Sequence, residues 1–393
     1  MSELLKRTWA EVDLDKILKN YQAIRTYVRP QSKLMAIVKA DAYGHGDPII
    51  AKEFDAAGAD WFGVSNIEEA EQIRNIGIQK PILILGFTPV QFAGKLIEQN
   101  ITQSVFSKEY AKELNSAAQK AGGKVKIHIK LDTGMSRIGF VYHGEDDAEA
   151  LVADVCAAAK LSNLVVDGVF THFAVSDEPG NPYTQTQFDR FMRAIALLEK
   201  EGVHFPLRHC CNSAGLLNYP EMQLDMVRPG IILYGMTPSL GMPLPIKLLP
   251  TMKLKSVLFQ EKWLAAGTPV SYGMTYKTPT RRRLGTLPIG YADGFVRALA
   301  DKEDVLIRGK RARIVGRVCM DQCMADITEI QKVQSGDEVT IIGQDGEDEI
   351  PVEEIASNMN TINYEVTCLI GKRVPRVFFK GGEQVASLNY FLP

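Results

Sequence analysis

Residues of chemically reactive types follow several apolar, β-branched runs of this sequence. Lys39 ends the run IVK and precedes the turn-rich segment ADAYGHG, and His172 follows VVDGVF. A lysine that is partly removed from water loses its proton more readily, and a neutral amine can form an imine with a carbonyl compound. Taken alone, Lys39 would more often be a solvated strand-end residue and His172 a loop-bonded one. The pattern therefore indicates a reactive site only if other strand ends contribute to it.

Two further segments have the features of an anion site. Asn212 and Ser213 follow the run LRHCC, where a hydroxyl group and the first amides of the next helix would face negative charge. The segment VRPGII contains Arg228, and Gly230 allows the backbone of Gly230 and Ile231 to approach a phosphate closely. A buried salt bridge is the simpler interpretation of Arg228 alone. Together with an imine-forming lysine and a ring-facing histidine, these residues fit pyridoxal phosphate better than a sugar phosphate.

The order of elements predicts how these residues come together. Up to about Gly235, eight short apolar runs alternate with amphipathic helical patterns, as expected for a (β/α)8 barrel of the TIM type. The runs are LMAIVK (34–39), WFGVS (61–65), ILILG (82–86), TQSVF (102–106), VKIHIKL (125–131), LVVDGVFTH (164–172), LRHCC (207–211) and MVRPGIILY (226–234). An additional helical segment, LDKILKNYQAIRTYV, precedes the first run. In such barrels the active site lies at the C-terminal ends of the strands, where the residues above stand.

The composition changes after a proline-rich segment at 237–250. Short β-type segments punctuated by glycine follow it, and the long helical patterns largely stop. We therefore predict an α/β chain with two domains: a cofactor-binding barrel at residues 1–245 and a mainly β C-terminal domain at 246–393.

Composition excludes several classes of function. With 45 Lys and Arg against 47 Asp and Glu and a net charge of -2, the chain lacks the positive field that nucleic-acid binding requires. No leader pattern or membrane-spanning apolar run is present, which predicts a cytoplasmic protein without a membrane partner. The six cysteines are scattered, and Cys319 and Cys323 lack a second ligand pair. We therefore expect free thiols and no metal.

Nine segments of the chain together resemble the bacterial alanine racemases. They run in order over nearly the whole sequence: VKADAYGHG (38–46), KLDTGMSRIG (130–139), THFA (171–174), CNSAG (211–215), VRPGIILYG (227–235), SYGMTY (271–276), GYADG (290–294), GRVCMDQCM (316–324) and TINYEV (361–366). The resemblance implies a fold-type III pyridoxal-phosphate enzyme that interconverts L-alanine and D-alanine and supplies D-alanine for peptidoglycan. It also implies a head-to-tail homodimer in which each active site takes residues from both chains.

The resemblance implies a role for each matching residue. The two catalytic bases are Lys39, which also holds the cofactor as a Schiff base, and Tyr272 of the partner subunit. His172 corresponds to the residue stacked on the pyridine ring, and Arg228 to the arginine bonded to the ring nitrogen. The remaining cofactor contacts are Tyr43, Arg137, Ser213, Gly230, Ile231 and Tyr364. The substrate contacts are Arg137 and Met320 of the partner subunit, the entry corridor is lined by Tyr291 and Arg297, and Lys130 matches a lysine that is carbamylated in several members. Cys210 and Cys211 depart from the family, in which small residues are commoner before Asn212.

Other functions stay open at this point. A fold-type III amino-acid decarboxylase shares the two-domain pattern but usually has a carboxylate at the ring nitrogen, where this chain has Arg228. A pyridoxal-phosphate carrier built on the barrel alone gives no role to the C-terminal SYG and CMD segments. A barrel isomerase that uses a metal ion or acts on a sugar phosphate has no need of Lys39 as an imine-forming lysine. Serine racemisation on the same scaffold is the hardest to exclude, since a small pocket rejects an added hydroxyl only about 100-fold.

Overall fold

All eight predicted runs form strands of one parallel sheet in the structure, a computed structural model that describes residues 6–392. In sequence order they are β2 (Lys33–Ile37), β3 (Trp61–Val64), β4 (Ile82–Ile84), β5 (Ile101–Val105), β6 (Val125–Asp132), β8 (Leu164–Phe170), β9 (Arg208–His209) and β10 (Met226–Val227). Their order in the sheet is β10-β2-β3-β4-β5-β6-β8-β9, and β7 (Phe140–Val141) pairs with β6 off this path. Side chains of β3, β4 and β5 are buried throughout, as parallel strands covered on both faces require.

The sheet closes into a barrel between its first and last strands. The amide of Asp225 donates to the carbonyl of Arg208 at 3.1 Å, and the amide of Arg228 donates to the carbonyl of Cys211 at 3.0 Å. Both bonds join the segments of β9 and β10. The predicted (β/α)8 barrel is therefore confirmed.

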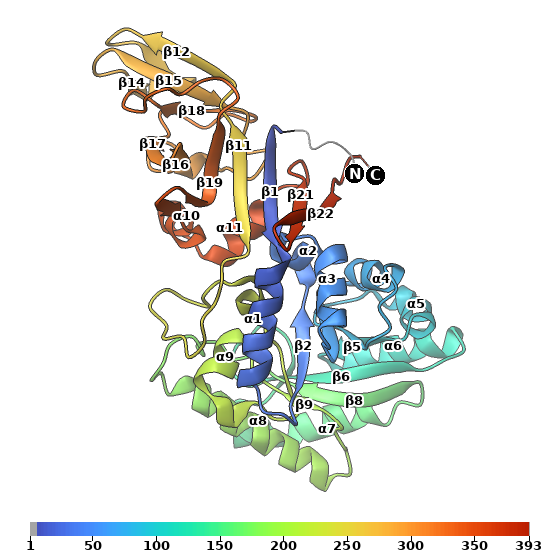
Figure 1. The fold of residues 1–393 in the computed structure, drawn as a ribbon. Coiled ribbons are helices and arrows are strands. Elements are labelled where there is room, and N and C mark those ends of the chain that lie inside the picture. Colours follow the sequence, from blue (N-terminus) through green and yellow to red (C-terminus); the bar gives the residue numbers. More distant parts are fainter. Residues whose placement is uncertain (1–5, 393) are drawn as a thin grey trace. The chain divides into compact units, whose positions relative to one another are not determined.

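Helices surround the barrel strands (Figure 1). They are α1 (Leu14–Tyr27), α2 (Lys39–Gly44), α3 (Asp47–Ala56), α4 (Ile67–Asn75), α5 (Ala93–Glu98), α6 (Lys108–Lys120), α7 (Ala148–Ala159), α8 (Tyr183–Lys200) and α9 (Ser213–Asn218), with 3-10 turns at Val90–Phe92, Glu145–Asp147, Pro220–Met222 and Ile231–Tyr234. Side chains cap several of them: Asn66 accepts the amide of Glu69 at the start of α4, and Asn212 accepts that of Gly215 at the start of α9. The caps fix where each helix begins beside its strand.

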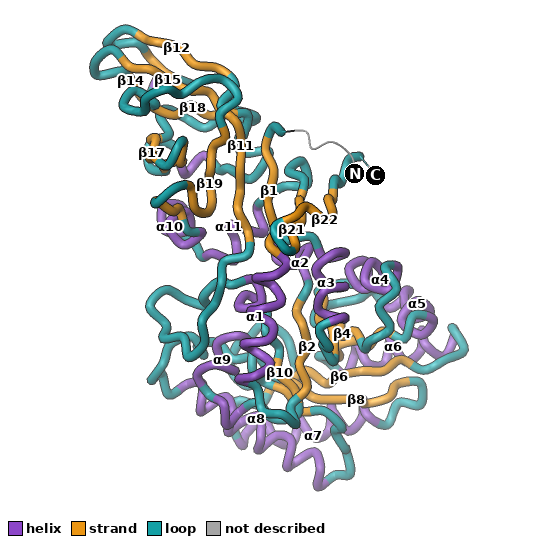
Figure 2. Tube along the Cα trace, viewed as in Figure 1, coloured by secondary structure: helices purple, strands orange, loops and turns teal. Residues whose placement is uncertain are grey.

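The C-terminal part is mainly β, as predicted (Figure 2). Its strands are β11 (Met252–Val257), β12 (Gln260–Leu264), β13 (Pro269–Val270), β14 (Tyr276–Lys277), β15 (Arg282–Leu287), β16 (Asp304–Ile307), β17 (Lys310–Arg313), β18 (Cys323–Asp326), β19 (Glu338–Asp345), β20 (Asp348–Ile350), β21 (Arg376–Lys380) and β22 (Glu383–Leu388). Its helical elements are α10 (Val352–Met359), α11 (Asn363–Leu369) and 3-10 turns at Tyr272–Met274 and Arg297–Leu299. β12, β15 and β18 form a separate three-stranded sheet.

The first strand of the chain, β1 (Thr8–Asp13), belongs to the C-terminal sheet. It pairs antiparallel with β11 and parallel with β21. One compact unit accordingly contains the segment that ends at Ile17, Tyr43–Gly46 and the chain from Leu249 onward, and the other contains Leu18–Ala42 and Asp47–Leu248. The two units interleave along the chain because strand pairing, and not chain order, decides where β1 belongs. No helix in residues 6–392 is long and apolar enough to cross a bilayer.

Candidate active site

Lys39 begins a helical turn of unusual hand. The four residues that follow it in α2 have φ between 53° and 56°, in the left-handed region. That conformation costs about 1–2 kcal/mol for each residue other than glycine. Strain of this kind persists only where the surroundings hold it, and it is concentrated at functional sites. The left-handed turn directs the chain away from the end of β2 and leaves Lys39 half-buried at the barrel's C-terminal mouth.

Arg228 is the most extensively bonded cation of the barrel mouth. It is only 3% exposed. Its guanidinium donates to Nδ1 of His209 at 2.8 Å, to the carbonyl oxygens of Thr171 and Cys210 at 2.9 and 3.0 Å, and to Nδ1 of His172 at 3.2 Å. Within residues 6–392 no carboxylate forms an ion pair with it, so the buried-salt-bridge interpretation is wrong. A buried charge without a counter-ion is costly, which favours an acceptor or anion supplied by a ligand.

His172 lies among four cations. Its pKa is held well below the usual value by burial and then by the positive charges of Arg228, Arg137, Lys130 and Lys39. The neutral ring accepts from Arg228 at Nδ1, which places its proton on Nε2. Three of the residues expected to contact a cofactor, Arg228, Arg137 and Lys39, therefore lie near His172, which is a fourth, and Lys130 lies near it as well.

Two histidines that contribute to this site, His209 and His128, were not identified from the sequence. Since Nδ1 of His209 accepts from Arg228, its Nε2 carries the proton and donates to Nδ1 of His128 at 2.9 Å. Both rings are fully buried, and burial together with Arg228 lowers the pKa of His128 to about 3. They hold Arg228 in place as neutral groups. The available signal was a histidine at an inward position of each of two apolar strands, VKIHIKL and LRHCC.

Lys130 is buried close to the same cations. Burial, Arg228 and Arg137 lower its pKa to about 7 against the opposing effect of Asp132. Its Nζ donates to the carbonyl of Leu131 at 2.7 Å. Lys130 is therefore a lysine whose neutral, nucleophilic form is accessible near neutrality.

Arg137 stands at the end of a tightly held turn. Oδ1 of Asp132 accepts the amides of Gly134, Met135 and Ser136 at 3.0, 3.1 and 3.0 Å. From α8, the hydroxyl of Tyr183 donates to the carbonyl of Gly134 at 2.9 Å. The exposed side chain of Arg137 is thus presented by a backbone fixed from two sides.

The anion-binding segments also meet. The amide of Gly230 donates to Oγ of Ser213 at 2.8 Å, and Ser213 is the first residue of α9 while Ile231 opens the following 3-10 turn. The two helical N-termini, whose first amides point away from the helix and have no partner within it, therefore start side by side. In the other compact unit the rings of Tyr43 and Tyr364 lie 6.1 Å apart, and burial followed by Tyr364 raises the pKa of Tyr43 far above its ordinary value.

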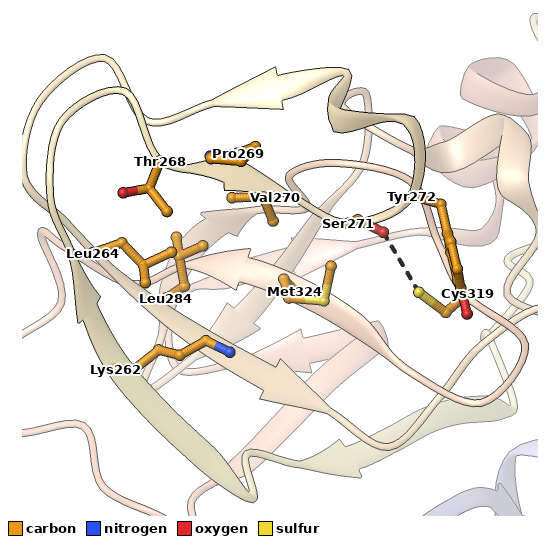
Figure 3. A pocket seen from close by; sticks show the side chains of 10 residues that line it. All are labelled: Lys262, Leu264, Thr268, Pro269, Val270, Ser271, Tyr272, Leu284, Cys319 and Met324. Atoms are coloured by element: carbon orange, nitrogen blue, oxygen red, sulfur yellow. Dashed lines mark hydrogen bonds between the residues drawn. The ribbon is translucent and has the colours of Figure 1, made fainter.

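Tyr272 lies in a strained turn of the C-terminal unit. The residue before it, Ser271, has φ of 63°, and Ser271 Oγ lies 3.5 Å from Sγ of Cys319. Tyr272 and Cys319 stand side by side at the edge of a pocket of about 430 Å³ that β12, β15 and β18 help to form (Figure 3). Tyr272 is 71% exposed, so most of its surface is open to solvent in its own chain.

Three other predicted residues, Tyr291, Met320 and Arg297, also belong to the C-terminal unit. Two of them lie next to each other, and the third is separate. The amide of Tyr291 donates to the carbonyl of Cys319 at 3.1 Å, which places Tyr291 beside Met320. Met320 is 53% and Tyr291 41% exposed. Arg297 is exposed on a 3-10 turn, and within residues 6–392 no hydrogen bond or ion pair joins its side chain to Tyr291 or Met320. Cys210 and Cys211 are fully buried and both thiols donate to the carbonyl of Met222.

The chain is similar to known alanine racemases over nearly its whole length. Family models described as the alanine racemase N-terminal and C-terminal domains match residues 12–238 and 251–378. An alanine racemase of Desulfovibrio desulfuricans is 48% identical over 94% of this chain and 97% of its own. The alanine racemase structure from Clostridium difficile 630 superposes with a TM-score of 0.93 at 38% identity, covering 99% of this chain and 100% of that one. The alanine racemase of Bartonella henselae, solved with covalently bound pyridoxal phosphate, has a TM-score of 0.83 at 30% identity and covers 95% of this chain and 99% of that one.

The matched ranges of the two family models extend over both compact units. The alanine racemase family is dependent on pyridoxal phosphate in general and consists of isomerases that interconvert the enantiomers of alanine. The chain belongs to the alanine racemase family.

Proposed function

We propose that the barrel mouth binds pyridoxal phosphate and that the protein acts as a homodimer with shared active sites. The observation that carries this proposal is the convergence of four cations on a neutral, half-buried His172. The residues fit the cofactor: a phosphate would meet Ser213 and the amides of Gly230 and Ile231, and a ring nitrogen that accepts would meet Arg228. When bound, pyridoxal phosphate draws electrons from Cα of the substrate and makes its hydrogen acidic.

Different residues of this chain then carry out the steps that invert the configuration at Cα of the substrate. Inversion requires a proton to leave one face and return to the other, so two bases on opposite faces are needed. We assign Lys39 to the D-face and Tyr272 of the partner subunit to the L-face. Arg137 orients the substrate carboxylate together with the amide of Met320 of the partner subunit. A tyrosine has an unperturbed pKa near 10, so Tyr272 requires a cationic site such as the one around Arg137.

The exposure of Tyr272 supports the shared site. A catalytic base that is 71% exposed in its own chain works in a water-filled environment unless a second copy covers it.

We further propose a cytoplasmic enzyme that supplies D-alanine for peptidoglycan. Serine racemisation is the alternative that this geometry leaves standing, whereas a decarboxylase would place a carboxylate where Arg228 stands.

Borohydride reduction tests the cofactor assignment. The purified protein is incubated with pyridoxal phosphate and borohydride, which reduces a C=N bond between cofactor and lysine to a stable amine. Mass spectrometry of the digest should then find the added mass on the peptide that contains Lys39, and D-alanine should form from L-alanine before reduction. Added mass on another lysine, or none, would remove Lys39 from its role.

Replacing Arg228 by glutamate should change which reaction occurs. An arginine only donates, so a ring nitrogen bonded to it carries no proton of its own, whereas a carboxylate would favour a protonated ring and a stronger electron sink. We expect Arg228→Glu to reduce racemisation by about a hundredfold and to raise the share of transamination. D-alanine and pyruvate formed from L-alanine are measured together. Arg228→Lys, which keeps a cation, serves as the control, and an unchanged product ratio in Arg228→Glu would refute this role.

Lys130 should react with carbon dioxide. Its pKa of about 7 means that the neutral amine becomes the main form as the pH rises above that value, and only the neutral amine adds carbon dioxide to give a carbamate. The resulting negative charge would offset Arg137 and Arg228. With labelled bicarbonate, nuclear magnetic resonance should show the signal of a carbamate carbon. This signal should become stronger as the pH is raised from well below to well above the pKa of Lys130. A signal that survives in Lys130→Arg would exclude Lys130 as its source.

A further inference from the structure

Glu69, in the first turn of α4, makes two hydrogen bonds that the proposed mechanism does not use. Its Oε1 accepts the amide of Ala40 at 2.8 Å, and its Oε2 accepts the amide of Ser65 at 2.7 Å. Ser65 follows β3, and Ala40 directly follows Lys39. The side chain of Asn66 accepts the amide of Glu69 at 2.9 Å and so fixes the position from which Glu69 reaches out. One half-buried carboxylate thereby joins the ends of β2 and β3 at the barrel mouth.

The bond to Ala40 acts on the geometry of Lys39. The carbonyl carbon of Lys39 and the amide of Ala40 belong to one rigid peptide plane, so holding that amide fixes the backbone rotation at Lys39. This rotation is the point at which the chain changes from the extended strand β2 to the left-handed turn. A released turn would relax toward right-handed backbone, and the Cα–Cβ bond of Lys39 would then point elsewhere.

The chemistry of Glu69 suits this task better than that of its nearest isostere. A carboxylate offers two acceptor oxygens, and hydrogen bonds to a charged acceptor are stronger than those between neutral groups. Glutamine offers one oxygen, and its NH2 group would face a backbone N–H. Glu69→Gln therefore cannot satisfy both amides, although it keeps the size of the side chain.

We infer that Glu69 is a positioning residue for Lys39, which it holds at the entrance to the left-handed turn through the amide of Ala40. The inference rests on the proposed role of Lys39 as the lysine that binds the cofactor. It goes beyond that role because Glu69 touches neither cofactor nor substrate and acts through the backbone.

The test compares Glu69→Gln and Glu69→Asp with Glu68→Gln. Glu68 precedes Glu69 on α4, is exposed and forms no hydrogen bond or ion pair with another residue of the described chain, so it controls for loss of charge at the helix start. Glu69→Asp keeps the charge but is one methylene too short to span both amides. Amide hydrogen exchange is followed in the cofactor-free proteins, together with the rate at which pyridoxal phosphate becomes covalently attached.

Both substitutions of Glu69 should speed exchange in the peptide that covers residues 38–46. They should also slow covalent attachment by about ten- to a hundredfold, while Glu68→Gln behaves as the unmodified protein. A lower melting temperature with unchanged exchange and attachment would show that Glu69 only supports α4, and would overturn the inference. If no attachment occurs at Lys39 in the unmodified protein, the proposed function fails instead, and the exchange measurement still decides what Glu69 holds.

Discussion

Lys39→Ala should abolish racemisation in both directions, with a loss of at least about 10³-fold in the turnover of either enantiomer. The reason is that Lys39 has two tasks in the proposed site. It holds the cofactor covalently, and after release it exchanges the proton on the D-face of Cα. Neither enantiomer can pass to the other without that proton. Initial rates from L-alanine and from D-alanine measure the effect, at a pyridoxal-phosphate concentration high enough to compensate for weaker binding.

Lys33→Ala is the matched control for this loss. Lys33 opens the same strand, β2, and is exposed at its far end. It should keep full activity, which separates the loss of this amine from a general effect on the strand. A small external amine should restore part of the activity of Lys39→Ala, because it can fill the vacated space and carry a proton. Activity retained in Lys39→Ala without added amine would contradict the assignment.

The strands and their order could be predicted from the sequence because their cause is local. Each barrel strand is a short apolar run between turn residues, and parallel strands buried on both faces require that composition. β1 could not be placed in this way. Its sequence, TWAEVD, is compatible with either unit, and only pairing with β11 and β21, hundreds of residues away, decides the matter.

The sequence allowed the residue types of the site to be predicted, but it did not allow the pKa shifts of those residues to be predicted. A lysine, a histidine and an arginine at strand ends could be recognised, but the lowered pKa of Lys130 depends on burial and on Arg228 and Arg137, which only the closed barrel brings near. The left-handed turn after Lys39 also could not be predicted from the sequence. Residues such as Ala40 and Tyr43 do not favour positive φ, and the contacts that hold them come from distant segments.

Tyr272→Phe should remove deprotonation of L-alanine while sparing that of D-alanine. The substitution deletes one hydroxyl oxygen and keeps the ring, so it removes the L-face base without emptying the site. In heavy water, we expect exchange of the Cα hydrogen of L-alanine to fall by about 10³-fold, and exchange in D-alanine to fall far less because Lys39 is intact. Tyr276→Phe, in the neighbouring strand β14, is the control and should leave both rates unchanged. Equal loss from both enantiomers would refute the two-base assignment.

Mixing the two inactive variants tests whether Tyr272 acts in the partner subunit. If each site combines Lys39 of one chain with Tyr272 of the other, a dimer of one Lys39→Ala chain and one Tyr272→Phe chain contains one intact site and one doubly altered site. Random reassociation of equal amounts should then restore about a quarter of the unmodified activity, because half of the dimers are mixed and each has one working site. If both bases came from the same chain, no mixed dimer would contain an intact pair and activity would stay absent. The 71% exposure of Tyr272 in its own chain favours the first outcome, since the phenol gains a closed, cationic environment only from a second copy.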